Sequence, residues 1–93
     1  MNEAALQRKC ITYAKREGWL GFKWASPAHR GIPDCLFFKD GQLIIIEFKH
    51  PNGKGRLSPL QRKTIDDLAS QSFAVFVVDN FEDFKAILTR KLR

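Results

Sequence analysis

The sequence has little cysteine and no long hydrophobic run, and both scarcities exclude whole classes of protein. Its two cysteines, Cys10 and Cys35, are too few for the disulfide framework of a small secreted protein. No apolar run approaches the roughly 20 residues that cross a bilayer. The N-terminal segment also lacks the apolar stretch of a signal peptide. We therefore expect a cytoplasmic protein without a membrane partner, whose cysteines are reduced and buried in the core.

Internal repeats, low-complexity tracts and linkers are also absent, so we expect one domain that comprises residues 1–93. Hydrophobic residues make up 44% of the chain and include eight Phe, which is enough for a core. Lys and Arg number 16 against 10 Asp and Glu, so the net charge is +6. This excess favours a polyanionic partner such as nucleic acid, although solubility alone would also account for it.

The pattern of apolar and capping residues predicts an α/β fold. Helices are predicted where apolar residues recur every three or four positions behind a capping residue, namely residues 3–17, 58–71 and 80–90. Strands are predicted where β-branched and aromatic residues run together, namely residues 19–25, 34–39, 42–49 and 73–78. The order α-β-β-β-α-β-α predicts a mixed four-stranded sheet flanked by helices. The last two strands should run parallel through a right-handed crossover.

Residues 34–49 hold the clearest unit, because two apolar runs flank Asp40-Gly41, a dipeptide typical of a type I′ turn. With a two-residue turn, the numbers of each cross-strand pair add up to 81, as do 34 and 47. Asp34 and Glu47 should therefore face each other on the same side of the sheet. Both runs are apolar on both faces, which predicts central strands in a sheet covered on each side.

Two facing carboxylates beside apolar segments repel each other, and a divalent cation would remove this conflict. Mg²⁺ (or Mn²⁺) takes oxygen ligands, typically one or two carboxylates, with water and substrate phosphate completing its shell. Lys49 lies two residues beyond Glu47, on the same face, where it could orient or deprotonate a water or stabilise a phosphate. The alternative is that Lys49 only forms a salt bridge with Glu47 or Asp34 at a sheet end.

The motifs GIPD at residues 31–34 and EFK at residues 47–49, in this order and spacing, resemble the PD-(D/E)XK nuclease superfamily. More narrowly, the chain looks like the VRR-NUC family of stand-alone, phage-type and repair-associated nucleases over nearly its whole length. The resemblance implies a restriction-endonuclease-like core. It also implies that the metal ligands are Asp34, Glu47 and the backbone carbonyl of Phe48, and that Lys49 is the catalytic lysine.

The resemblance assigns two further residues to the site. Glu3, on the first helix, would reach the metal through an intervening water, and Gln61 would lie at the edge of the catalytic site. Each also has a purely structural explanation. An acidic residue such as Glu3 favours the first turn of a helix, and Gln61 completes a capping box with Ser58. For each residue the two roles are compatible.

Basic residues in the loops around the predicted site are candidate DNA contacts, namely His29, Arg30, Lys54 and Arg56. Each is explained at least as well as a solvated surface charge. The basic tail at residues 90–93 either contacts DNA or stabilises the end of the last helix. Trp19, Phe22 and Trp24 are expected to pack in the core or at a dimer surface rather than stack on bases.

The leading hypothesis is a metal-dependent, structure-selective DNA endonuclease that hydrolyses phosphodiester bonds. One site per chain cuts one strand, so a homodimer would make the paired cuts that branched DNA such as a four-way (Holliday) junction requires. The resemblance favours this substrate and a phage or mobile-element origin. Three alternatives stay open: a nickase, flap or general nuclease; a non-catalytic basic nucleic-acid-binding module; and a nuclease that works only inside a larger repair or packaging complex.

Overall fold

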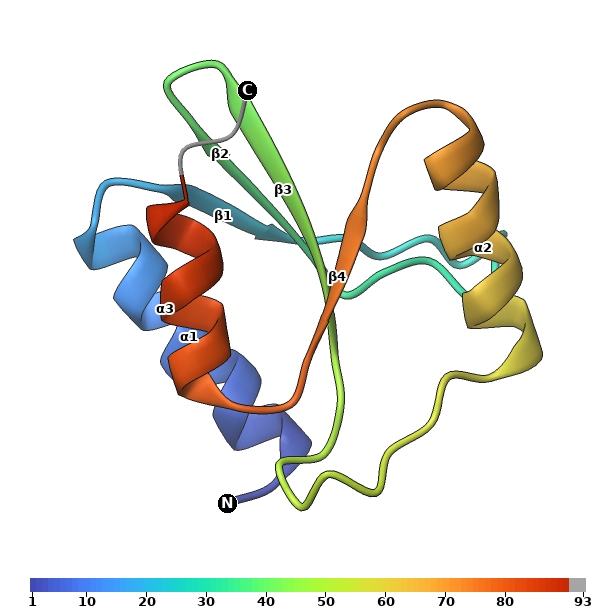
Figure 1. The fold of residues 1–93 in the computed structure, drawn as a ribbon, viewed down its shortest axis with the longest axis horizontal. Helices are drawn as coiled ribbons and strands as arrows, with labels where there is room; N and C mark the ends of the chain where they lie inside the picture. The colour runs from blue at the N-terminus through green and yellow to red at the C-terminus, as the bar shows by residue number, and fades with distance from the viewer. Residues whose placement is uncertain (91–93) are drawn as a thin grey trace.

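The computed structural model describes residues 1–90 and shows a twisted four-stranded sheet with helices on both sides (Figure 1). The predicted order of elements is confirmed. Residues 91–93 of the basic tail lie outside the described part. None of the described helices is long and apolar enough to cross a membrane. The elements are α1 (Glu3–Arg16), β1 (Leu20–Lys23), β2 (Cys35–Lys39), β3 (Gln42–Phe48), α2 (Pro59–Ser70), β4 (Val75–Val78) and α3 (Phe81–Thr89).

The strand order in the sheet is β1-β2-β3-β4. The pairs β1–β2 and β2–β3 are antiparallel, whereas β3 and β4 are parallel, as the predicted crossover through α2 requires. The last strand is shorter than predicted, because the Phe73 N–H donates to the Leu68 carbonyl (2.9 Å) and closes the end of α2. Pairing with β3 therefore starts only at Val75.

The β2–β3 hairpin has the predicted register, in which Cys35 pairs with Ile46. Asp40 (φ 50°) and Gly41 (φ 77°) both adopt positive φ, as a type I′ turn requires. The two strands also occupy the predicted central positions in the sheet. The turn therefore fixes which residues of β2 and β3 oppose each other over their whole length.

One face of the sheet packs against α1 and α3, and this layer holds the hydrophobic core (Figure 1). Phe37 and Phe84 meet edge to face, with ring centroids 5.3 Å apart. Cys10 and Cys35 are fully buried, as predicted, and burial raises the pKa of both thiols to about 12. Both cysteines therefore stay protonated and serve as small apolar residues. Trp19 also packs in the core.

The opposite face of the sheet is only partly covered. Leu20, Phe22 and Phe38 are 63%, 54% and 38% exposed, so the prediction that the central strands are covered on each side is wrong for β2. The reason lies in the number of helices available. A four-stranded sheet is about 15 to 20 Å wide, whereas one helix covers about 10 Å, and α2 lies beside β4 at one edge (Figure 1).

Candidate active site

The two carboxylates of the predicted site lie at one end of the β2–β3 pair. Asp34 directly precedes β2, and Glu47 is the penultimate residue of β3, so the hairpin register places them opposite each other. Glu47 is 2% exposed. Asp34 is held at two points, because its Oδ2 accepts a hydrogen bond from the Phe48 N–H and its carbonyl accepts one from the Trp24 N–H, both at 2.8 Å.

Gln61, in the first turn of α2, joins Glu47 to Lys49. Its Nε2 donates to Glu47 Oε2 at 2.8 Å, and its Oε1 accepts from Lys49 Nζ at 2.9 Å. Lys49 Nζ also lies 3.4 Å from Glu47 Oε2, and the Lys49 side chain is only 15% exposed. The structure therefore brings Asp34, Glu47, Lys49 and Gln61 into one cluster, from a hairpin and a helix.

The capping box predicted for α2 is present and holds Gln61 in this position. Ser58 Oγ accepts from the Gln61 N–H at 3.1 Å, and the Ser58 N–H donates to Gln61 Oε1 at 2.9 Å. The box uses the backbone N–H and the oxygen of Gln61, which leaves its Nε2 for Glu47. Capping and contact with the buried carboxylate are thus combined in one side chain.

Two glycines allow neighbouring segments of the chain to pack closely against each other around the cluster. At Gly31 (φ +82°), a Cβ would lie 2.6 Å from the Leu60 carbonyl oxygen, so the first turn of α2 packs directly on the segment that leads to Asp34. At Gly55, a Cβ would lie 3.1 Å from Lys49 Cβ, so the loop after β3 folds back over this lysine. Gly55 was not predicted from the sequence, where a lone glycine in a loop carries no specific signal.

The electrostatics of the cluster centre on Glu47. The pKa of its carboxyl is raised to about 7, first by burial and then by the charge of Asp34, although Lys49 acts to lower it. The charge of Glu3 also raises the pKa of Glu47, although Glu3 is exposed and forms no hydrogen bond with the cluster within residues 1–90. A cation placed beside the two carboxylates would favour their charged forms.

The donor set fits a small divalent cation. Mg²⁺ is typically held by one or two carboxylates and completes its octahedron with water and phosphate oxygens. Asp34 and Glu47 supply the carboxylates. The Phe48 N–H points toward Asp34, and because the N–H and C=O of a strand residue point to the same side, its carbonyl does as well. Among the described residues, no group of three or more His, Cys, Asp or Glu side chains is arranged to hold a metal ion.

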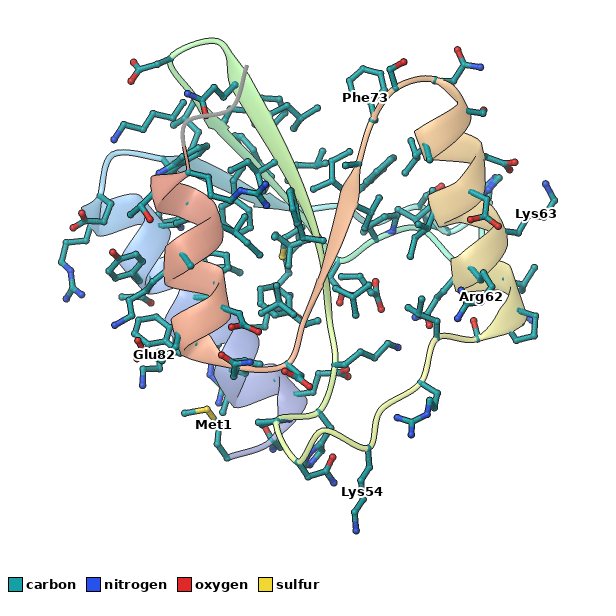
Figure 2. The ribbon with its side chains drawn as sticks, in the orientation of Figure 1. Met1, Lys54, Arg62, Lys63, Phe73 and Glu82 are labelled. Carbon is teal, nitrogen blue, oxygen red and sulfur yellow. The ribbon has the colours of Figure 1, made fainter. Side chains whose placement is uncertain are left out.

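The four candidate DNA contacts lie outside the cluster. His29 and Arg30 are exposed in a shallow groove of about 290 Å³ beside α2, together with Lys63. Lys54 and Arg56 are exposed in the loop after β3. Figure 2 shows Lys54 pointing away from this loop and Lys63 pointing outward from α2. In the part of the chain described, none of the four forms a hydrogen bond or ion pair with the cluster, so their role stays a prediction.

The chain is similar to known proteins over most of its length. Residues 5–81 match the VRR-NUC domain family. A curated relative, "Putative nuclease p44" of Acyrthosiphon pisum secondary endosymbiont phage 1, is 28% identical over 89 residues, which are 95% of this chain and 92% of that protein. A solved structure described as a VRR_NUC domain superposes with a TM-score of 0.84 at 21% identity, over 97% of each chain. That likeness establishes a shared fold.

Proposed function

We propose that this chain, which belongs to the VRR-NUC domain family and is a nuclease, is a divalent-metal-dependent DNA endonuclease. The observation that carries the proposal is the burial of Glu47 opposite Asp34, with Lys49 joined to Glu47 through Gln61. A buried carboxylate beside a second carboxylate destabilises a fold unless a positive charge accompanies it. Buried carboxylates with perturbed pKa values are found mainly at functional sites such as active sites.

The residues of the cluster would have different roles in hydrolysis. A Mg²⁺ or Mn²⁺ ion held by Asp34, Glu47 and the Phe48 carbonyl, with Glu3 acting through water, would polarise the phosphodiester and lower the pKa of the attacking water. The Lys49 ammonium has three donors, of which one forms a hydrogen bond with Gln61, and its nitrogen also forms an ion pair with Glu47. A remaining donor can orient the attacking water or stabilise charge on the phosphate.

The proposed substrate is branched DNA such as a four-way junction, cut by a homodimer. Each chain carries one cluster and cuts one strand, so paired cuts need two copies. The exposed apolar side chains of Leu20, Phe22 and Phe38 support association with a second copy. The net charge of +6 supports binding to the DNA backbone. The phage relative supports a phage or mobile-element origin.

A cleavage assay tests the metal-dependent chemistry. The protein is incubated with supercoiled plasmid and with a synthetic four-way junction, in Mg²⁺, Mn²⁺ or EDTA. We expect cleavage with either metal and none in EDTA. Asp34→Asn and Glu47→Gln should abolish it, whereas Asp66→Asn, which changes an exposed carboxylate on α2, should cleave as the wild type does. Cleavage that persists in both site variants would contradict the proposed cluster.

The same assay tests the substrate and the oligomeric state. Symmetric paired nicks on the junction support a junction-cutting homodimer, and single nicks on every substrate support a nickase or general nuclease. Tight binding of DNA without cleavage by the wild type would identify a non-catalytic binding module. Sedimentation at micromolar concentration gives the oligomeric state independently, and a monomer there contradicts the dimer.

A further inference from the structure

A groove is lined by residues of α1 and by Phe81, the first residue of α3. Both helices lie on the side of the sheet away from α2 (Figure 1). The volume of the groove is about 530 Å³. Three of its six lining residues are cations and none is acidic. The lining residues of this α1–α3 groove are Arg8, Lys9, Thr12, Tyr13, Arg16 and Phe81.

The three cations of the groove are available to an anion. Three other cations of the described residues form ion pairs with carboxylates, namely Lys49, Lys63 and Lys85. Within residues 1–90, by contrast, Arg8, Lys9 and Arg16 form no ion pair. Their side chains are exposed along one flank of α1. A concave surface with three unpaired cations is complementary to a polyanion.

Two of these cations, Lys9 and Arg16, lie over aromatic rings. Lys9 Nζ lies 4.4 Å from the centre of the Phe81 ring, and Arg16 Cζ lies 5.8 Å from the centre of the Tyr13 ring. The two rings meet edge to face, with centroids 5.3 Å apart. A guanidinium that lies over a ring keeps its in-plane N–H donors free for phosphate. Side chains positioned in advance also lose less conformational entropy when an anion binds.

The groove also follows the helix that starts beside the active site. α1 begins at Glu3, whose charge acts on Glu47, and Arg8 and Arg16 follow five and thirteen residues later. With a rise of about 1.5 Å per residue, they lie about 8 and 20 Å from Glu3 along the helix axis. Phosphates on one DNA strand rise by about 3.4 Å each. If α1 runs along the duplex axis, the interval between the two arginines spans three or four phosphates of one strand.

We propose that the α1–α3 groove is a second DNA-binding surface, which holds the phosphate backbone of a duplex arm beyond the cleaved bond. This inference rests on the proposed function, because it assumes that the substrate is DNA. Contacts to phosphate fix the position of a duplex without reading its sequence. Two separated contact surfaces on one small chain favour a substrate with arms long enough to reach both, as a branched DNA has.

Removal of the two arginines tests the groove. The double variant Arg8→Ala/Arg16→Ala keeps α1 intact, because both positions are exposed and alanine is the strongest helix former. Its control is Lys23→Ala/Lys39→Ala, which removes the same two charges from β1 and β2. Binding to a labelled 30-base-pair duplex is measured by anisotropy in EDTA over a salt series. We expect about tenfold weaker binding at 0.1 M salt, and a log–log salt slope shallower by about 2. The control should change both quantities far less.

A second pair of variants probes the groove without removing an arginine. Thr12 is exposed between Arg8 and Arg16, so Thr12→Glu introduces a carboxylate there and should also weaken binding. Thr12→Gln, its neutral counterpart, should bind as the wild type does. Circular dichroism shows whether the arginine variant is folded. If it is not, the difference in binding between Thr12→Glu and Thr12→Gln tests the groove without it.

The outcomes separate this proposal from the proposed function. Wild-type affinity and salt slope in Arg8→Ala/Arg16→Ala, or equal losses in its control, would overturn the groove as a DNA-binding surface even if the protein cleaves DNA. With cleavage in Mg²⁺, we expect the double variant to raise KM about tenfold and to leave kcat unchanged. If the wild type cuts no DNA, the proposed function fails, and the binding measured in EDTA still decides for or against the groove.

Discussion

Gln61 and Glu47 are joined by a hydrogen bond of 2.8 Å from an amide nitrogen to a buried carboxylate oxygen, although 14 residues separate them in the chain. One residue lies in the first turn of α2 and the other near the end of β3. The bond therefore links the start of α2 to the end of β3, where the charged side chains of the cluster lie. It also makes the capping of α2 and the orientation of Glu47 depend on one side chain.

Replacing Gln61 should separate these two roles. Gln61→Ala removes the contacts to Glu47 and Lys49. If Glu47 binds a metal as proposed, we expect the single-turnover cleavage rate to fall about 10- to 100-fold. Ser58→Ala is the matched control, because it removes the hydroxyl half of the capping box and leaves the side-chain contacts of Gln61 in place. It should cost about 1 kcal/mol of stability with little loss of cleavage. Equal losses of cleavage in both variants would show that only the cap is important.

Glu47 should make the metal-free protein less stable as the pH rises. The folded-state pKa of about 7 lies above the ordinary value of 4.5, so folding disfavours the charged form. Both states are protonated below pH 4.5, and the destabilisation develops between pH 4.5 and 7. In EDTA at pH 8, Glu47→Gln should therefore be more stable than the wild type, by about 3 kcal/mol. Urea unfolding from pH 4 to 8 measures this difference, and a difference that does not vary with pH would contradict it.

A divalent cation should reverse this destabilisation. Mg²⁺ or Mn²⁺ at 100 times its dissociation constant should stabilise the folded wild type by about 2.7 kcal/mol. Thermal unfolding with and without the metal measures the effect, and no DNA is needed. Asp34→Asn and Glu47→Gln should lose the stabilisation, whereas Asp66→Asn should retain it. If neither metal raises the melting temperature of the wild type, this result would argue against a cation at the cluster.

The close approach of α2 to Gly31 should be sensitive to one added methyl group. Gly31→Ala introduces strain at φ +82° and a Cβ only 2.6 Å from the Leu60 carbonyl oxygen. Gly41→Ala is the control, because it has the same kind of strain (φ +77°) with nothing within 4 Å. We expect Gly41→Ala to cost about 1 kcal/mol, and Gly31→Ala to cost about 1 to 3 kcal/mol more from overpacking. Only Gly31→Ala should also slow cleavage, because it displaces Gln61.

The parts of the fold that depend on local signals could be predicted from the sequence. The Asp40-Gly41 turn sets the hairpin register without reference to the rest of the chain, and Ser58 marks the start of α2 by capping alone. The open face of the sheet could not be predicted in the same way. Phe37 and Phe38 are adjacent and chemically identical, yet one is fully buried and the other is 38% exposed. Their difference depends on which helices cover each face, which is a tertiary property.

The candidate site likewise has one part that follows from local sequence signals and another that depends on tertiary packing. The cross-strand position of Asp34 and Glu47 follows from the hairpin, so it could be predicted before any packing was known. The Gln61 bridge depends on how closely α2 approaches the turn at Gly31, and that distance is not encoded in any local pattern. The α1–α3 groove was missed for a similar reason. Its arginines recur eight residues apart on one helix flank, but the concavity exists only once α3 packs beside α1.

The hairpin that carries the two carboxylates tolerates changes of residue better than changes of length. Side chains alternate between the faces of a strand, so one residue inserted into or deleted from β3 before Glu47 would reverse every face beyond that point. Glu47 would then point into the apolar layer under α1 and α3, and an apolar neighbour would take its place beside α2. We therefore expect homologous chains to vary freely in the length of the loop after β3, and to keep a constant number of residues between Asp34 and Glu47.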